Sequence, residues 1–183
     1  MRLYRQTIED FGLYPGLEMS DEQLQNLKVA AGKMSAKMRA VRIVAASSVS
    51  KSDLERRLVQ KGENPAQAKE AVAWMSEMSL LDDRSTAEQI VARCIAKGYG
   101  RTRAKQTLFE KRIPKEFWDD VLRDYPEQIE KIMDFLDAHL PNDATEKDIK
   151  RVIDALIRRG HSYGTIRRAM QEMAMNPDDL PEV

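Results

Sequence analysis

The fold of this chain is decided by residues 80–113, which read LLDDRSTAEQIVARCIAKGYGRTRAKQTLFEKRI. The first part has the apolar spacing of a helix that buries one face, at Ala87, Ile90, Val91, Cys94 and Ile95. The sequence KGYG follows at residues 97–100, with Gly98 where a left-handed backbone commonly ends a helix. A second, basic helix is predicted from about residue 101 to residue 111. The stretch therefore predicts two helices connected by a short glycine-containing segment, which we call the joint.

The same unit recurs at two fixed offsets. Sixty-two residues later the joint reads RGHS, at residues 159–162, and the apolar stripe before it is Ile149, Val152, Ile153, Leu156 and Ile157. Fifty residues earlier a weaker copy has the joint SSVS, at residues 47–50, and the stripe Ala40, Val41, Val44 and Ala45. Matched stripes, joints and second helices predict three copies of one helical unit.

The expected fold is all-α, with tandem three-helix repeats in an elongated, curved, right-angled array. We expect an N-terminal arm (1–19), a first repeat with a leading helix (20–79), a second repeat (80–125), and a connector helix with a third repeat (126–183). The arm is predicted to be non-helical or hairpin-like because Gly12, Pro15 and Gly16 favour turns. Gly32 is predicted to interrupt the leading helix. The third repeat is expected to be incomplete and to end in an acidic tail, because Pro177 and Pro181 prevent a full closing helix.

Composition limits the class of protein. The formal net charge is zero, 42% of the residues are hydrophobic, and no apolar run approaches the length of a membrane span. The N-terminus has no apolar segment typical of a secretory signal, and a single cysteine excludes an internal disulfide. We therefore expect a soluble cytoplasmic protein in which Cys94, on an apolar stripe, is a buried thiol.

Basic residues gather on the second helices of the last two repeats and at the joints before them. We expect these cations to project into solvent, because Ala104, Leu108, Ile166 and Met170 take the buried faces of the same helices. The candidate partner-binding residues are Lys97, Arg101, Arg103, Lys105, Arg112, Arg158, Arg159, Arg167 and Arg168. For each run of charge, a solvated helix face without a partner is the alternative.

No catalytic or metal-binding motif stands out. The chain has no GxxxxGK[ST] loop for nucleotide phosphates, and its two histidines and one cysteine lack metal-ligand spacing. We expect no enzyme activity, no metal and no cofactor. The joint residues are interpreted as structural: Gly98, Tyr99, Gly100, Gly160, His161 and Tyr163. Stacking of Tyr99 and Tyr163 on nucleobases is the alternative to packing.

Several of these segments resemble the RecX family of bacterial recombination regulators. They are LLDD with Ala87 and Val91, the joint KGYG with its basic helix, and RRGHSY with Ile166. EDFGLYPGLEMS and SKSDLERRLVQKG are similar to the amino-terminal part and first repeat of that family, so the resemblance spans about residues 11–173. The chain departs from the family pattern at His161, where phenylalanine is usual, at Thr86, where an aromatic is common, and at Ser47 and Ser48, where basic residues are frequent.

The resemblance implies a regulatory function that acts by binding and catalyses no reaction. A RecX-like protein would lie as a monomer in the groove of the RecA filament on single-stranded DNA, and would inhibit its ATPase, extension and strand exchange during recombination, DNA repair and the SOS response. Contact with single-stranded DNA would be weak and salt-dependent, and no membrane would be involved. A stand-alone nucleic-acid-binding module of the helix-turn-helix type is the alternative, because three-helix units with basic second helices resemble such readers.

Overall fold

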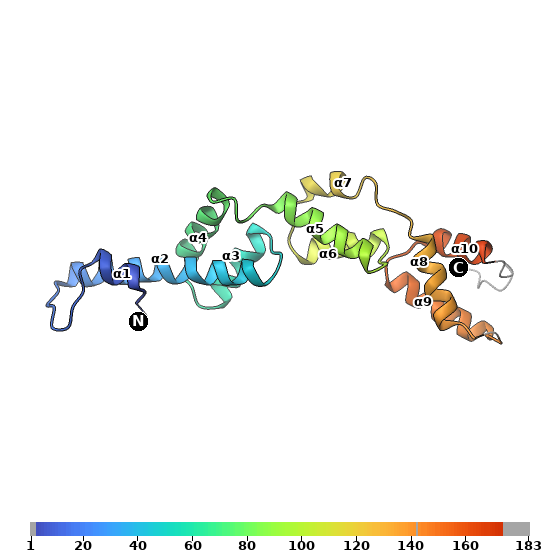
Figure 1. The fold of residues 1–183 in the computed structure, drawn as a ribbon, viewed down its shortest axis with the longest axis horizontal. Helices are drawn as coiled ribbons and strands as arrows, with labels where there is room; N and C mark the ends of the chain where they lie inside the picture. The colour runs from blue at the N-terminus through green and yellow to red at the C-terminus, as the bar shows by residue number, and fades with distance from the viewer. Residues whose placement is uncertain (1–2, 142, 174–183) are drawn as a thin grey trace. The chain divides into compact units, whose positions relative to one another are not determined.

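The structure is a computed structural model that describes residues 3–141 and 143–173. Every regular element in these two ranges is a helix, and this confirms the all-α fold predicted from the sequence (Figure 1). The chain divides into two compact units, with the division after Thr86. No helix in the described ranges is both long enough and apolar enough to cross a membrane.

The first unit contains α1 (Arg5–Asp10), α2 (Asp21–Ala46), α3 (Lys51–Gln60) and α4 (Pro65–Glu77). Each of the last three begins after a residue whose side chain caps the helix. Ser20 and Gln23 form a capping box on α2, the Ser50 hydroxyl accepts the Asp53 N–H on α3, and the Asn64 side chain accepts the Ala66 N–H on α4. Their apolar faces enclose the first core: Ala36, Ala40, Ile43, Val49, Leu54, Leu58, Ala68, Ala71, Val72, Met75 and Leu81.

Three predictions for this unit are wrong. The N-terminal arm is not devoid of helix, because residues 5–10 form α1 before the turns at Gly12 and Gly16. Gly32 does not interrupt the leading helix either, since α2 runs through it without a break. A β-carbon at Gly32 would collide with the end of the Gln67 side chain on α4, so glycine there leaves room for that side chain.

The third error concerns the buried face of α2. Val41 and Ala45, which were assigned to the apolar stripe, are exposed. In the C-terminal half of α2 the buried residues are Ala36, Ala40 and Ile43. Their i, i+4, i+7 spacing places the buried stripe on an adjacent part of the helix surface. The fixed offset of fifty residues between this repeat and the next therefore predicts the wrong residues for the buried face of α2.

The second unit begins at Ala87, inside the predicted second repeat, and continues through the third. It comprises most of α5 (Asp83–Ala96), followed by α6 (Arg101–Glu110), the 3₁₀ turn η1 (Lys115–Phe117) and α7 (Trp118–Val121). Then come α8 (Ile129–His139), α9 (Glu146–Arg158) and α10 (Tyr163–Glu172). The predicted stripe of α5 is buried except for the half-buried Ile95, and in α9 only Ile157 of the predicted stripe is exposed.

Two cores lie in this unit. One is formed by α5, α6 and the segment after them: Ala87, Ile90, Val91, Cys94, Ala104, Leu108, Ile113 and Leu122. The other combines α8 with α9 and α10: Ile132, Leu136, Ile149, Val152, Ile153, Leu156, Ile166, Ala169 and Met170. The connector helix α8, which precedes the third repeat's two main helices in sequence, thus contributes Ile132 and Leu136 to the third core. The closing helix and acidic tail expected at Asn176, Pro177 and Pro181 lie outside the described residues.

Candidate functional site

The joints of the second and third repeats end their helices in the same way. Gly98 has φ +66° and Gly160 has φ +90°, so both are in the left-handed region predicted for a residue just past a helix. The N–H of the next residue then reaches back to the helix, from Tyr99 to the Cys94 carbonyl and from His161 to the Leu156 carbonyl. An ordinary side chain would strain the backbone at either glycine.

These two joints also bind each other directly. The Gly100 N–H donates to the Arg159 carbonyl (2.9 Å), and the Thr102 N–H donates to the Gly160 carbonyl (3.2 Å). A β-carbon on Gly100 would overlap the Gly160 carbonyl, and one on Gly160 would overlap the backbone nitrogen of Arg103. Glycines in both joints therefore allow two backbones to come together, which the comparison of the repeats did not predict.

His161 extends this contact with its side chain. It is only 6% exposed, and its Nε2 lies 3.0 Å from the Gly98 carbonyl oxygen. Burial lowers the pKa of His161, the nearby Arg159 lowers it further, and the hydrogen bond to Gly98 offsets part of this shift. The ring is therefore neutral near pH 7, with Nε2–H donating to Gly98.

Aromatic residues and Arg159 complete the packing around the joints. The Arg159 guanidinium lies 5.9 Å from the Tyr99 ring centroid and 4.6 Å from that of Phe135. The Tyr125 hydroxyl donates to the Tyr99 carbonyl at 2.6 Å, and burial raises the pKa of Tyr125 to about 12. Tyr99 packs on the second core and Tyr163 on the third, and both side chains are half-buried.

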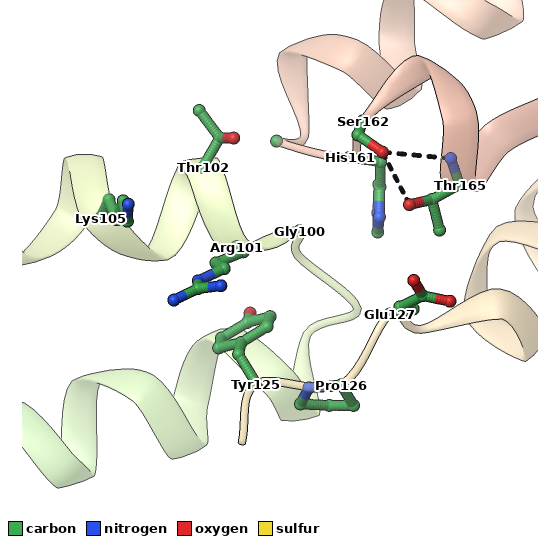
Figure 2. Close-up of a pocket in the computed structure, with 11 residues that line it drawn as sticks. Gly100, Arg101, Thr102, Lys105, Tyr125, Pro126, Glu127, His161, Ser162 and Thr165 are labelled. Carbon is green, nitrogen blue, oxygen red and sulfur yellow. Dashed lines mark hydrogen bonds between the residues drawn. The ribbon is translucent and has the colours of Figure 1, made fainter. Parts of the chain in front are cut away.

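A cleft of about 470 Å³ opens beside the paired joints, and we call it the joint cleft (Figure 2). Arg101 and Lys105 lie on its α6 side, one helical turn apart. Opposite them, the Ser162 hydroxyl accepts the N–H of Thr165 at 3.1 Å and caps α10. The other lining residues are Gly100, Thr102, Tyr125, Pro126, Glu127, Gly160 and His161. The cleft thus combines two cations, one carboxylate, four hydroxyl side chains and the first turns of two helices.

The nine candidate cations fall into two groups. Three have partners within the chain: Arg103 pairs with Glu110, Arg168 pairs with Glu127 and Glu172, and Arg159 covers the two aromatic rings. The other six are exposed and form no ion pair with any carboxylate in the described residues; they are Lys97, Arg101, Lys105, Arg112, Arg158 and Arg167. Only Arg101 and Lys105 line the joint cleft. Arg112 follows the far end of α6, about 15 Å away along the helix axis.

The cleft brings in residues that the sequence did not single out. The Glu127 carboxylate accepts a hydrogen bond from the Arg168 guanidinium, with 2.7 Å between Nη1 and Oε2. Ser162, Thr165 and Thr102 contribute hydroxyl groups to the cleft. Ser162 could have been found as the capping residue of α10, since it aligns with Gly100 at the start of α6. Glu127 lies in the connector, and its position depends on tertiary packing that no local pattern records.

The polar side chains around the joint cleft are two cations, one carboxylate, one histidine and four hydroxyls. No three histidine, cysteine, aspartate or glutamate side chains gather around a common point in the part of the chain that the structure describes. Cys94 is buried, and burial raises the pKa of its thiol, so it is a poor nucleophile near neutral pH. Cations and hydroxyls around a cleft are the chemistry that binds carboxylates and phosphates.

Comparison with known proteins gives related chains over most of the length. Residues 82–122 match the family model described as the second three-helix domain of RecX. The chain is 28% identical over 141 residues to the regulatory protein RecX of Trichlorobacter lovleyi, covering 73% of this chain and 92% of that protein. It is 29% identical over 142 residues to the regulatory protein RecX of Chlorobaculum tepidum, covering 76% and 88%. A crystal structure of a regulatory protein RecX shares the fold, with a TM-score of 0.69, 19% identity, and coverage of 91% and 85%.

The fold and the site define a helical repeat protein whose joints are locked together beside a basic cleft. Within that class, the chain is a relative of the RecX regulatory proteins, and the resemblance of its sequence to the RecX family is confirmed.

Proposed function

We propose that this chain regulates a RecA recombinase by binding its nucleoprotein filament through the cations around the joint cleft. Binding would slow ATP hydrolysis, filament extension and strand exchange by bridging neighbouring protomers. Support comes from the relatives, which are named regulatory proteins, and from the all-helical fold. Regulation by binding would require a contact surface and no catalytic group.

The observation that carries this proposal is the state of Arg101 and Lys105. Both side chains are exposed at the cleft and have no carboxylate partner in the described chain, so neither is required for an internal ion pair. Both project from α6, which is fixed by its buried residues Ala104 and Leu108 and by the hydrogen bonds between the two joints at its N-terminus. Cations fixed in this way can act together on the encounter rate and register of an acidic partner. The remaining unpaired cations, Lys97, Arg112, Arg158 and Arg167, would extend the contact, and Arg103, Arg159 and Arg168 would support it.

The experiment is a titration of RecA ATPase on single-stranded DNA with substoichiometric amounts of this protein. We expect the rate to fall with the parent chain and to fall much less with the double variant Arg101→Glu and Lys105→Glu. The helical content and melting temperature of that variant should stay close to those of the parent, because exposed charges contribute at most about 1 kcal/mol each to folding. A full ATPase rate at every ratio of the parent protein would refute the proposal.

A matched control uses Lys147→Glu with Lys150→Glu. These lysines are exposed on the first turns of α9 and lie outside the joint cleft, and their reversal changes the net charge by the same amount. Equal loss of inhibition in both double variants would indicate a general charge effect rather than a site. Bare single-stranded DNA serves as the second control, since tight and steeply salt-dependent binding without RecA would favour the stand-alone nucleic-acid module.

A further inference from the structure

A second, apolar hollow lies at the opposite end of α6 from the joint cleft. Its volume is about 560 Å³, and its walls include Phe109, Pro114 and Trp118. Phe109 is 69% exposed, more than any other large apolar side chain in the described residues. The Trp118 ring is held in place because its Nε1–H donates to the Ile113 carbonyl at 3.1 Å. We call this feature the Phe109 hollow.

The rim of the Phe109 hollow contains a strained arginine. Arg112 has φ +55°, in the left-handed region where a residue with a β-carbon costs about 1 kcal/mol relative to glycine. It follows Lys111, the C-cap residue of α6. Its N–H donates to the Phe109 carbonyl, and the Ile113 N–H donates to the Leu108 carbonyl. Strained residues of this kind concentrate at binding sites, where the surrounding structure maintains them.

The first repeat shows that the turn does not need an arginine. Gly62 stands fifty residues earlier at the same position, with φ +90°. The backbone hydrogen bonds there are the same: the Gly62 N–H donates to Val59, and the Glu63 N–H donates to Leu58. Glycine thus forms this turn without strain, and the Arg112 guanidinium has no carboxylate partner in the described chain to stabilise it. The side chain of Arg112 therefore has no internal role that explains its place.

The charges around the hollow indicate what it can hold. Arg112 and Lys115 lie on the rim and are exposed, and Glu110 lies there too. Glu116, Asp119 and Asp120 follow in the next turns. A polyanion such as nucleic acid would meet these carboxylates, whereas a protein segment can place one carboxylate at Arg112 and turn the rest of its backbone away. Phe109, Pro114 and Trp118 would enclose an apolar side chain.

We propose that the Phe109 hollow binds a segment of a partner protein that presents one large apolar side chain beside a carboxylate. The apolar side chain lies between Phe109 and Trp118, and the carboxylate accepts hydrogen bonds from Arg112. This surface shares no lining residue with the joint cleft, and of its residues only Arg112 is also among the cations proposed to extend the filament contact.

The two tryptophans of the chain make the test specific. We would record the indole N–H resonances of the full ¹⁵N-labelled chain while adding a short capped peptide in which one leucine is flanked by glutamates. Trp118 should shift and Trp74, which packs on the first core, should not. Replacing the leucine of the peptide by alanine, or its glutamates by glutamines, should weaken binding about tenfold, as expected for one apolar anchor or one charge-assisted contact.

Arg112→Gly separates binding from folding. This variant should melt at a higher temperature than the parent, because it removes the strained backbone, and should bind the peptide about tenfold more weakly. Gly62→Arg is the reciprocal control: a β-carbon there meets no atom within 4 Å, so it should lower the melting temperature through φ alone and leave peptide binding unchanged. Phe109→Ser should abolish binding without loss of helical content.

Three results would overturn the proposal. The first is an unmoved Trp118 resonance at millimolar peptide. The second is a lower melting temperature for Arg112→Gly, which would give Arg112 a structural role. The third is a larger Trp118 shift with oligothymidylate than with the peptide, which would make the hollow a single-stranded nucleic-acid surface.

Discussion

Gly100 and Gly160 hold the second and third repeats together because neither carries a side chain. Each lies against the backbone of the other repeat, and their two N–H···O=C bonds run between joints that are about sixty residues apart in sequence. Gly164, two residues into α10, offers a contrast, because a β-carbon there would meet only the Ser162 hydroxyl at 3.9 Å.

We therefore expect Gly160→Ala and Gly164→Ala to change stability in opposite directions. Gly160→Ala combines a positive φ with a backbone overlap and should lower the free energy of unfolding by about 2 kcal/mol or more. Gly164→Ala should raise it by about 0.5–1 kcal/mol, because alanine is the better helix former. Urea unfolding of the two variants measures both changes. Equal, small effects would mean that the joints are not in close contact.

His161 predicts how stability depends on pH. Its pKa is lowered in the folded chain, so between the folded value and the ordinary value of 6.5 the unfolded chain binds more protons. Its contribution to stability is fully present above pH 6.5 and is lost as the pH falls below that value. The melting temperature should therefore drop between about pH 7.5 and pH 5.5. His161→Gln, which can still donate to Gly98 but does not titrate, should show a smaller drop; an identical drop would place the titrating group elsewhere.

The helix α2 carries a prediction about Gly32. The glycine lowers the intrinsic stability of the helix, but its missing side chain leaves room for Gln67 on α4. Gly32→Ala alone should have a small effect, because the gain in helix propensity opposes the displacement of Gln67. In a Gln67→Ala background the same change should stabilise the chain by up to about 1 kcal/mol. Thermal unfolding of the two single variants and the double variant measures this coupling. The coupling would vanish if α2 were broken at Gly32.

Local sequence patterns predicted where helices lie better than they predicted which elements the helices pack against. Capping residues such as Ser20, Ser50 and Asn64 mark helix starts in the sequence, because a cap depends on the few residues next to it. The interruption at Gly32 was wrong, because a glycine that leaves room for a neighbouring side chain has the same sequence signature as one that ends a helix. The helix at residues 5–10 was missed for a related reason, since the turn signals after it dominated that segment.

The candidate site was predictable only in part. Repeated stripes identified Arg101 and Lys105 as outward-facing cations, but repeat equivalence could not show that one joint touches the other. Arg112 appeared as one more cation, although its left-handed backbone sets it apart. The pairing of Arg168 with Glu127 depends on how α10 packs against the connector, which is a tertiary property.

The two compact units have separate cores, and each contains one of the two tryptophans. Trp74 packs on the first core, with the Lys37 ammonium 5.1 Å from its ring centroid, and Trp118 packs on the core of the second repeat. Because the two units have separate cores, each can open with its own free energy. Fluorescence of single-tryptophan variants can therefore follow each unit alone.

We predict that Gly160→Ala destabilises only the second unit. In a Trp74→Phe background, where Trp118 reports, its urea midpoint should fall, because the lost contacts between the joints all lie after Thr86. In a Trp118→Phe background, where Trp74 reports, the midpoint should not move. Gly164→Ala in the same two backgrounds is the control, and it should shift only the Trp118 signal, toward higher urea. Parallel shifts of both signals would mean that the chain unfolds as one cooperative body, and that the division after Thr86 has no thermodynamic counterpart.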